Sequence, residues 1–270
     1  MLVIDSQIHL WTGPGVPPHH GTGPYTAEQA MRDMRAAGID AAVNQPPNWD
    51  PNSNAYAVEA ATAFPDRFAT LGWLKLNDPG APERVRTWRS QAGMLGFRFL
   101  CAAEEERSWP VDGTMDWFWP LAESLGLPVA LCGPFLLPHL VRIATGFPNL
   151  KLIVDHLGFV GFTENHGLIQ APDMLSWARF PNVAVKLTGA PDYAADAYPY
   201  KSMHSVVRQL YDAFGPERLL WGSDITRLKC TWREALTMYT EEMPWLSEAD
   251  KALIVGENLR RWLGWTPGQP

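Results

Sequence analysis

The feature of this sequence that most constrains its fold is a repeated alternation of short apolar runs with segments of helical periodicity. The runs are short, as buried strands are, and the first contains the β-branched Val3 and Ile4 near its start. They are Leu2–Leu10, Ala41–Gln45, Phe68–Lys75, Leu95–Cys101, Leu127–Cys132, Leu150–His156, Asn182–Leu187 and Arg218–Asp224. The helical patterns are Thr26–Ala37, Ser53–Phe64, Pro82–Gln91, Met115–Leu125, Leu137–Thr145, Pro172–Arg179, Met203–Phe214 and Trp232–Glu241, and a ninth, Ser247–Leu263, follows.

Strands that alternate with helices predict parallel βαβ units. Eight such units in 270 residues are typical of a (β/α)8 barrel, the TIM barrel. No segment has the composition of a linker, so we expect a single domain over residues 1–270. An open doubly wound sheet is the alternative, which the lack of a GxGxxG motif after the first run weakens. Gly38 and Gly126 follow two of the predicted helices, where glycine commonly ends a helix.

Charge and composition exclude several classes of partner. The net charge is −7 and no Lys/Arg-rich run is present, which argues against nucleic acid. No run of 18 apolar residues and no signal pattern occurs, so we expect a cytoplasmic protein without a membrane partner. Three cysteines without metal-binding spacing fit a reducing compartment. The expected partner is a small-molecule substrate, and a homodimer is left open.

Polar or reactive side chains lie at the end of every predicted strand. In a parallel barrel the carboxyl ends of the strands meet at one face, where catalytic groups lie. These ends carry Gln7 and His9, Asn44 and Gln45, Trp73 and Lys75, Arg98, Cys132, His156, Lys186, and Asp224. So many groups on one face predict a substrate pocket there.

Alternation along the first strand predicts that Asp5, Gln7 and His9 share one face. Taken alone, His9 could equally be a hydrogen-bonded core histidine, and Cys132 could be plain packing. Trp73 and Lys75 lie on either side of Leu74 at the end of the third predicted strand. We expect only one of these two side chains to point into the barrel. The remaining histidines are expected to be mostly solvated, in loops or helices: His19, His20, His139, His166 and His204.

Two cations lie inside apolar strands. Arg98 keeps its charge when buried, and a buried Lys186 without a partner would lose its charge. Each therefore needs a protein carboxylate or a ligand anion. We expect Arg98 to meet the substrate. An internal ion pair with Asp5 or Asp155 is the alternative.

Six segments, in order along nearly the whole chain, carry a family likeness: IDSQIHLW, LGFRF, IVDHLG, VAVKLTG, LLWGSD and VGENLRRWLGW. Together they resemble the amidohydrolase superfamily. Within it they are similar to the branch of 2-pyrone-4,6-dicarboxylate lactonase and the fucono- and rhamnono-lactonases. The resemblance implies a distorted TIM barrel and a hydrolase of a small cyclic ester.

The chain departs from the metal pattern of that superfamily. The pattern has His-x-His on the first strand, Lys or Glu on the fourth, His on the fifth and sixth, and Asp on the eighth. Here Gln7, Arg98 and Cys132 stand at the first, fourth and fifth strands. Because Gln is a poor zinc ligand and the bridging Lys is missing, we expect no two-metal centre and no bound metal. The alternative is a single divalent ion, zinc or manganese, on His9, His156 and Asp224.

Our first functional hypothesis is hydrolysis of a sugar lactone or a pyrone-type lactone. Asp224 would be the general base for water, while His9 and His156 polarise the carbonyl oxygen. The predicted substrate-binding residues are Arg98, Lys186, Gln7, Trp11, Trp73 and Asn44.

Two other hypotheses come from different classes. One is a metal-dependent decarboxylase of a small aromatic or unsaturated acid, against which Gln7 and the missing fifth-strand histidine argue. The other is a binding protein without catalysis, against which the joint presence of His9, His156 and Asp224 argues.

Overall fold

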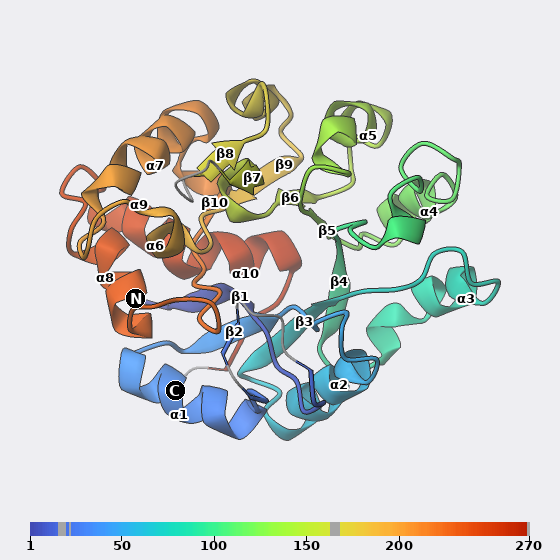
Figure 1. Ribbon diagram of the computed structural model, residues 1–270, viewed down its shortest axis with the longest axis horizontal. Coiled ribbons are helices and arrows are strands. Elements are labelled where there is room, and N and C mark those ends of the chain that lie inside the picture. Colours follow the sequence, from blue (N-terminus) through green and yellow to red (C-terminus); the bar gives the residue numbers. More distant parts are fainter. Residues whose placement is uncertain (16–19, 22, 163–167, 269–270) are drawn as a thin grey trace.

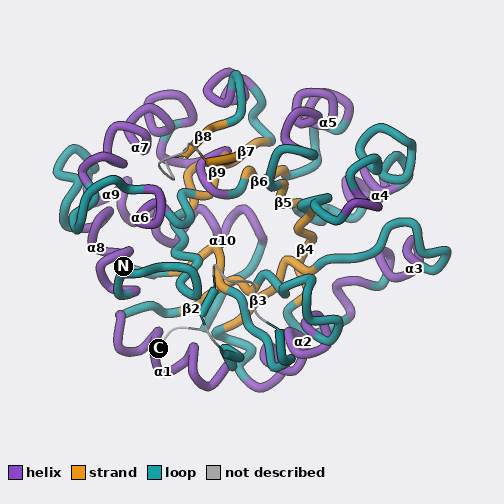
Figure 2. Tube along the Cα trace, in the orientation of Figure 1, coloured by secondary structure: helices purple, strands orange, loops and turns teal. Residues whose placement is uncertain are grey.

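The computed structural model describes residues 1–15, 20–21, 23–162 and 168–268. Its centre is a parallel eight-stranded sheet that curls into a barrel, with helices around the outside (Figures 1 and 2). The strands, in sheet order, are β1 (Ile4–Ile8), β2 (Ala41–Asn44), β3 (Phe68–Gly72), β4 (Met94–Phe99), β5 (Val129–Leu131), β6 (Leu152–Val154), β9 (Val183–Lys186) and β10 (Leu219–Leu220). All eight predicted strands are present, each shorter than its apolar run.

The two ends of the sheet are joined by backbone hydrogen bonds. The Ser6 N–H donates to the Trp221 carbonyl at 3.1 Å, and the Asp224 N–H donates to the Gln7 carbonyl at 2.9 Å. The strand that starts the chain thus lies beside the segment that follows β10. These bonds bring the sheet close to closure, so the open doubly wound alternative is wrong.

Helices follow the strands as predicted, with differences in detail. They are α1 (Ala27–Ala37), α2 (Ser53–Ala63), α3 (Ala81–Arg86), α4 (Phe118–Ser124), α5 (Leu140–Gly146), α6 (Ala190–Tyr193), α7 (Lys201–Phe214), α8 (Trp232–Thr240), α9 (Glu248–Ala252) and α10 (Asn258–Leu263). Among the described residues, none of the helices has the length and apolar character needed to cross a membrane.

Two segments differ from the predicted pattern. The segment predicted as the helix Pro172–Arg179 is a 3₁₀ helix over Met174–Arg179, entered through a left-handed Asp173. Before it, β7 (Phe159–Phe162) and β8 (Leu168–Gln170) form an antiparallel pair that we did not predict. Strands of three or four residues are too short to show periodicity in a sequence.

The last predicted helix, Ser247–Leu263, is divided by a π-helical turn over Leu253–Glu257 between α9 and α10. The turn is bonded to the barrel, because the Ile254 carbonyl accepts a hydrogen bond from the Trp221 N–H at 2.8 Å. Leu259 and Leu263 of α10 then pack on the apolar side chains in the barrel interior. That interior layer is Ile4, Ala41, Val43, Leu71, Ala130, Ile153, Ala184 and Leu220. Helix α10 therefore closes the end of the barrel opposite the predicted pocket.

An irregularity in β1 corrects the expected face of Asp5. The pairing register of β1 with β2 shifts between Asp5 and Ile8. Ile4 lies in the barrel interior, and after the shift Gln7 does too, so Asp5 faces outward. There its carboxylate accepts hydrogen bonds from the Trp232 indole at 2.7 Å and from the backbone N–H of Ser223 and of Gln7. Burial raises the pKa of Asp5 to about 6.

Helix ends follow the local sequence. Thr26 caps α1 by accepting from the Gln29 N–H, and Gly38 ends it in the left-handed conformation at φ 79°. Thr231 and Glu234 form a capping box at the start of α8. Thr231, and not Asp224, is therefore the N-cap of α8.

The bond between Trp232 and Asp5 gives a test of what stabilises β1. We expect Trp232→Phe to lower the free energy of unfolding by about 1.5–3 kcal/mol at pH 8, because a buried carboxylate loses a donor. Trp88→Phe is the matched control, since the Trp88 indole donates to the neutral Gly96 carbonyl at 3.0 Å and should cost about 1 kcal/mol. Urea denaturation followed by circular dichroism measures both, and equal losses would contradict the assignment.

Candidate active site

A cavity of about 880 Å³ lies at the carboxyl ends of the strands. Its wall contains both apolar or aromatic side chains and charged groups. Its lining includes Pro46, Pro47, Trp49, Leu71, Trp73, Leu74, Phe99, Leu100 and Phe159, together with His9, His20, Arg98, Glu106, Cys132, His156, Asp192, Asp224, Arg227 and Lys229. A cavity of this kind suits a small ring that carries polar or anionic groups.

Asp224 lies between two basic groups. Its Oδ1 is 3.1 Å from His9 Nε2, and its Oδ2 is 3.2 Å from the Arg227 guanidinium. Burial raises the pKa of this carboxyl, but His9 and Arg227 outweigh burial and hold the pKa well below its usual value. Asp224 is therefore ionised throughout the physiological range.

The contacts of His9 define where its protons are. His9 Nδ1 lies 2.6 Å from the Gln45 carbonyl oxygen, which only accepts, so Nδ1 carries a proton. Nε2 lies 3.1 Å from Oδ1 of the Asp224 carboxylate. His9 is thus held through Nδ1 by the Gln45 carbonyl and faces Asp224 through Nε2.

His156 has the opposite character. Its Nε2 lies 3.2 Å from the Gln7 amide nitrogen and 3.5 Å from Arg98 Nη2, both of which only donate. Its Nδ1 lies 3.0 Å from the Thr188 hydroxyl. Burial lowers the pKa of His156 to about 3, so the ring is neutral. Nε2 is therefore an acceptor, and these contacts do not fit the predicted role of His156 as a donor to a carbonyl oxygen.

Asp155 holds the two buried cations that the sequence analysis singled out. Its Oδ1 is 3.0 Å from Lys186 Nζ, and its Oδ2 is 2.6 Å from Arg98 Nε. Burial raises the pKa of Asp155, but Lys186 and Arg98 outweigh it and hold the pKa at about 2. Arg98 thus makes the internal ion pair that was the alternative, and it also lines the cavity. The ion pair with Asp155 therefore does not exclude the predicted contact of Arg98 with a substrate.

The other predicted site residues divide into two groups. Trp73 lines the cavity, with its indole N–H bonded to Ser53 at 3.1 Å, while Lys75 is exposed. Four predicted substrate-binding residues are not part of the cavity wall: Gln7, Trp11, Asn44 and Lys186. Asn44 accepts from the Leu10 N–H, and Trp11 packs behind Trp49 and His20.

The structure adds residues that sequence reasoning missed. His20 was expected to be solvated, but it lines the cavity, bonds to Thr226 at 2.9 Å and packs against the rings of Trp49 and His9. Arg227 also lines the cavity, and its signal was its place three residues after Asp224. His139 and His204 are half-buried, away from the cavity, and His19 and His166 lie outside the described residues.

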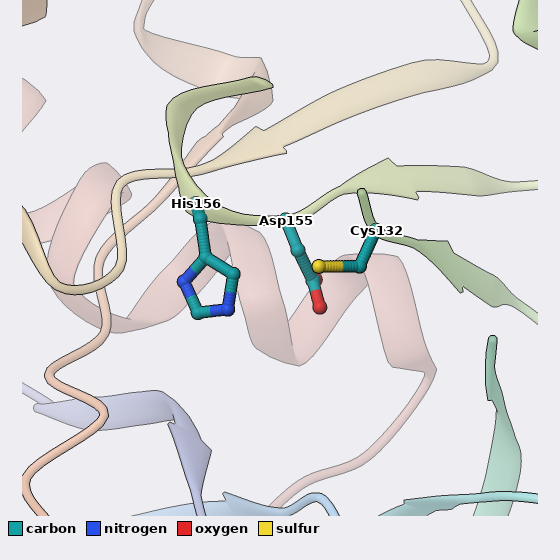
Figure 3. A group of neighbouring side chains, drawn as sticks. All are labelled: Cys132, Asp155 and His156. Atoms are coloured by element: carbon teal, nitrogen blue, oxygen red, sulfur yellow. The ribbon is translucent and has the colours of Figure 1, made fainter. Parts of the chain in front are cut away.

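Within the described part of the chain, one group could present three ligand atoms to a metal within 4.8 Å of one another: Cys132, Asp155 and His156 (Figure 3). Its chemistry does not fit a divalent cation. Asp155 already pairs with Lys186 and Arg98. Burial raises the pKa of the Cys132 thiol to about 11, so it is not a thiolate.

The lone pair of His156 Nε2 is likewise already engaged, by the Gln7 amide and Arg98. Nor do His9, His156 and Asp224 offer a single-ion site of the same compactness.

The neutral state of His156 predicts a pH effect on stability. The unfolded chain protonates this residue below its ordinary pKa of 6.5, whereas the folded chain resists protonation until about pH 3. This contribution is fully present above pH 6.5 and is lost as the pH falls toward 3. The variant His156→Asn has no imidazole to titrate, so it lacks this pH-dependent loss of stability. We expect wild type to lose up to about 1.4 kcal/mol per pH unit relative to the variant between pH 6 and 4. Urea denaturation at each pH measures this, and parallel curves would contradict it.

The sequence is similar to those of two lactone hydrolases. L-fucono-1,5-lactonase of Burkholderia ambifaria is 27% identical over 174 residues, which cover 63% of this chain and 59% of that protein, under two thirds of its length. 4-Sulfomuconolactone hydrolase of Hydrogenophaga intermedia is 24% identical over 232 residues, covering 82% of this chain and 73% of that protein.

Solved structures share the fold at lower identity. An amidohydrolase from Burkholderia multivorans with bound zinc has a TM-score of 0.81 at 22% identity, covering 98% of this chain and 99% of that one. A probable 2-pyrone-4,6-dicarboxylic acid hydrolase from Acinetobacter baumannii has a TM-score of 0.77 at 17% identity, covering 98% and 100%. 2,6-Dihydroxybenzoate decarboxylase from Rhizobium has a TM-score of 0.69 at 15% identity, covering 97% and 98%.

The family model that matches this sequence is that of the amidohydrolases, and the match extends over residues 4–265. The barrel, the cavity at the carboxyl ends of its strands and the sequence match agree. The chain belongs to the amidohydrolase family.

Proposed function

We propose that this protein hydrolyses a small lactone and does so without a metal ion. The observation that carries the proposal is the ionised Asp224 carboxylate at the cavity wall, held by His9 and Arg227, with the Arg98 guanidinium lining the same cavity. This arrangement supplies a general base and fixed positive charges, which are what ester hydrolysis needs. Two relatives with lactone substrates support it.

The reaction we propose starts with a water molecule beside Asp224. As the water oxygen bonds to the lactone carbonyl carbon, its proton passes to Asp224, and negative charge develops on the carbonyl oxygen. Arg98 provides the nearby positive charge and N–H donors, and His9 holds the Asp224 carboxylate in place. When the ring C–O bond breaks, the proton moves to the leaving alkoxide, which gives an open-chain hydroxy acid.

This scheme keeps the predicted role of Asp224 and changes those of His9 and His156. Because His156 Nε2 is an acceptor, His156 holds the Arg98 guanidinium instead of the carbonyl oxygen. The aromatic wall made by Trp73 and Trp49 would pack on the substrate ring. Gln7, Lys186, Asn44 and Trp11 act from behind the wall, by holding the residues that form it.

The decarboxylase hypothesis rests on fold likeness to proteins such as the Rhizobium enzyme. Nothing in this site favours it, since it requires a metal and the candidate ligands already have other partners. The sugar-lactone and pyrone-type substrates both fit a cavity with aromatic and cationic walls, and a panel of lactones followed by proton release would separate them.

The first test is Asp224→Asn. Asp224 has a left-handed backbone at φ 59°, which Asn tolerates, so we expect the fold to survive. Because an amide cannot take a proton, lactone turnover should fall by about 10²–10⁴. Asp192→Asn is the matched control: it changes the same charge at the same cavity, but among the described residues Asp192 forms its ion pair with Arg227 and not with His9. A near wild-type kcat in Asp224→Asn would remove Asp224 from the mechanism.

The second test concerns the metal. We expect the purified protein to hold no stoichiometric zinc or manganese, and chelator treatment to leave lactone turnover unchanged, since Lys186 and Arg98 already neutralise Asp155. Elemental analysis and turnover before and after chelation measure both. One ion per chain together with chelator-sensitive turnover would instead support a metal hydrolase or a decarboxylase.

A further inference from the structure

We propose that Gln7 is a positioning residue that fixes the proton of His156 on Nδ1, and that Lys186 in turn fixes the orientation of Gln7. This inference deepens the proposed function, because His156 orients Arg98 at the cavity wall. It assigns to Gln7, which stands where the family has a metal-binding histidine, a role in controlling a proton.

The first link is between Lys186 and Gln7. Both side chains are fully buried. Lys186 Nζ lies 3.1 Å from Gln7 Oε1, and an ammonium group only donates. The carbonyl end of the Gln7 amide must therefore face Lys186. The NH₂ end then has to point the other way, toward the ring of His156.

The second link is between Gln7 and His156. With the amide fixed, its NH₂ group donates to His156 Nε2 over 3.2 Å. The single proton of the neutral ring is then on Nδ1, and Nδ1 donates to the Thr188 hydroxyl over 3.0 Å. Thr188 also accepts from the His156 backbone N–H at 3.2 Å, which holds the ring and its backbone together.

The charged groups around His156 are compatible with this arrangement. Arg98 from β4 faces Nε2 at 3.5 Å and adds a second donor there. The Asp224 carboxylate lies 4.0 Å from Nε2, but its oxygens are engaged by His9 and Arg227. Asp155 is engaged by Lys186 and Arg98. Neither of these two carboxylates therefore competes for a proton on Nε2.

The experiment is long-range ¹H–¹⁵N correlation spectroscopy of the full chain labelled with ¹⁵N-histidine. The signals of His156 are assigned by their loss in His156→Asn. At pH 7 we expect a neutral ring with its proton on Nδ1. A proton on Nε2 in the wild-type protein would overturn the proposal.

Gln7→Glu is the decisive variant, since it keeps the shape but replaces the NH₂ donor with an oxygen that only accepts. We expect a proton to appear on Nε2 of His156, and kcat to fall about 10-fold or more with little change in KM, because moving a positioned group by about 1 Å can cost up to about 100-fold in rate. Gln29→Glu, on the exposed face of α1, is the matched control for the added charge and should leave the His156 signals unchanged.

Gln7→Met provides a second test if Gln7→Glu does not fold. Without the amide donor, a measurable fraction of His156 should carry its proton on Nε2. A ring that stays wholly Nδ1-protonated in both Gln7 variants would show that Gln7 does not set the tautomer. The spectra need no substrate. Expected spectra without lactone turnover would therefore reject the proposed function and leave the positioning role of Gln7 intact.

Discussion

The pairing of Asp155 with both Lys186 and Arg98 is the interaction on which the rest of the site depends. Three charged groups from β4, β9 and the end of β6 meet inside the barrel, where a charge without a partner is very unfavourable. Each oxygen of Asp155 meets a different cation, so neither cation can move without leaving a buried charge unpaired. Gln7 then orients on Lys186, and His156 on Gln7 and Arg98. These contacts form a series that begins in the barrel interior and ends at the cavity.

The same pairing bears on the metal-free chemistry proposed for this site. A barrel that binds zinc needs lone pairs of histidine and carboxylate groups turned toward one point. Here Lys186 and Arg98 occupy the space around Asp155 and supply positive charge as part of the polypeptide. Unlike a metal ion, they cannot dissociate, and Arg98 carries its charge to the cavity wall. In the proposed reaction, a fixed guanidinium assists the carbonyl group less strongly than zinc would. This weaker assistance suits an ester better than an amide, because an ester has the better leaving group.

Much of this arrangement could be predicted from the sequence, and the part that could not has a physical reason. Strand periodicity placed His9, Arg98, His156 and Asp224 at one face of a barrel, because side chains that end parallel strands must meet. The irregularity in β1 could not be predicted, and it turned Asp5 outward. The conformations of loops could not be predicted either. Trp11 was expected to contact the substrate, but Trp49 and His20 line the cavity and Trp11 packs against them. Periodicity carries no information about a loop.

Two neighbouring residues of the site, His156 and Asp224, have strained backbones. His156 and Asp224 both have positive φ values, 50° and 59°, which non-glycine residues rarely adopt and which cost about 1–3 kcal/mol each. Both strained residues are held by their own backbone N–H groups: His156 donates to Thr188 and Asp224 donates to the Gln7 carbonyl. The bond from Asp224 to Gln7 is also one of the two that bring the barrel close to closure. The strand pairing that nearly closes the fold thus fixes the carboxylate proposed as the base. Gln7 contributes to both, through its backbone carbonyl to Asp224 and through its side chain to His156.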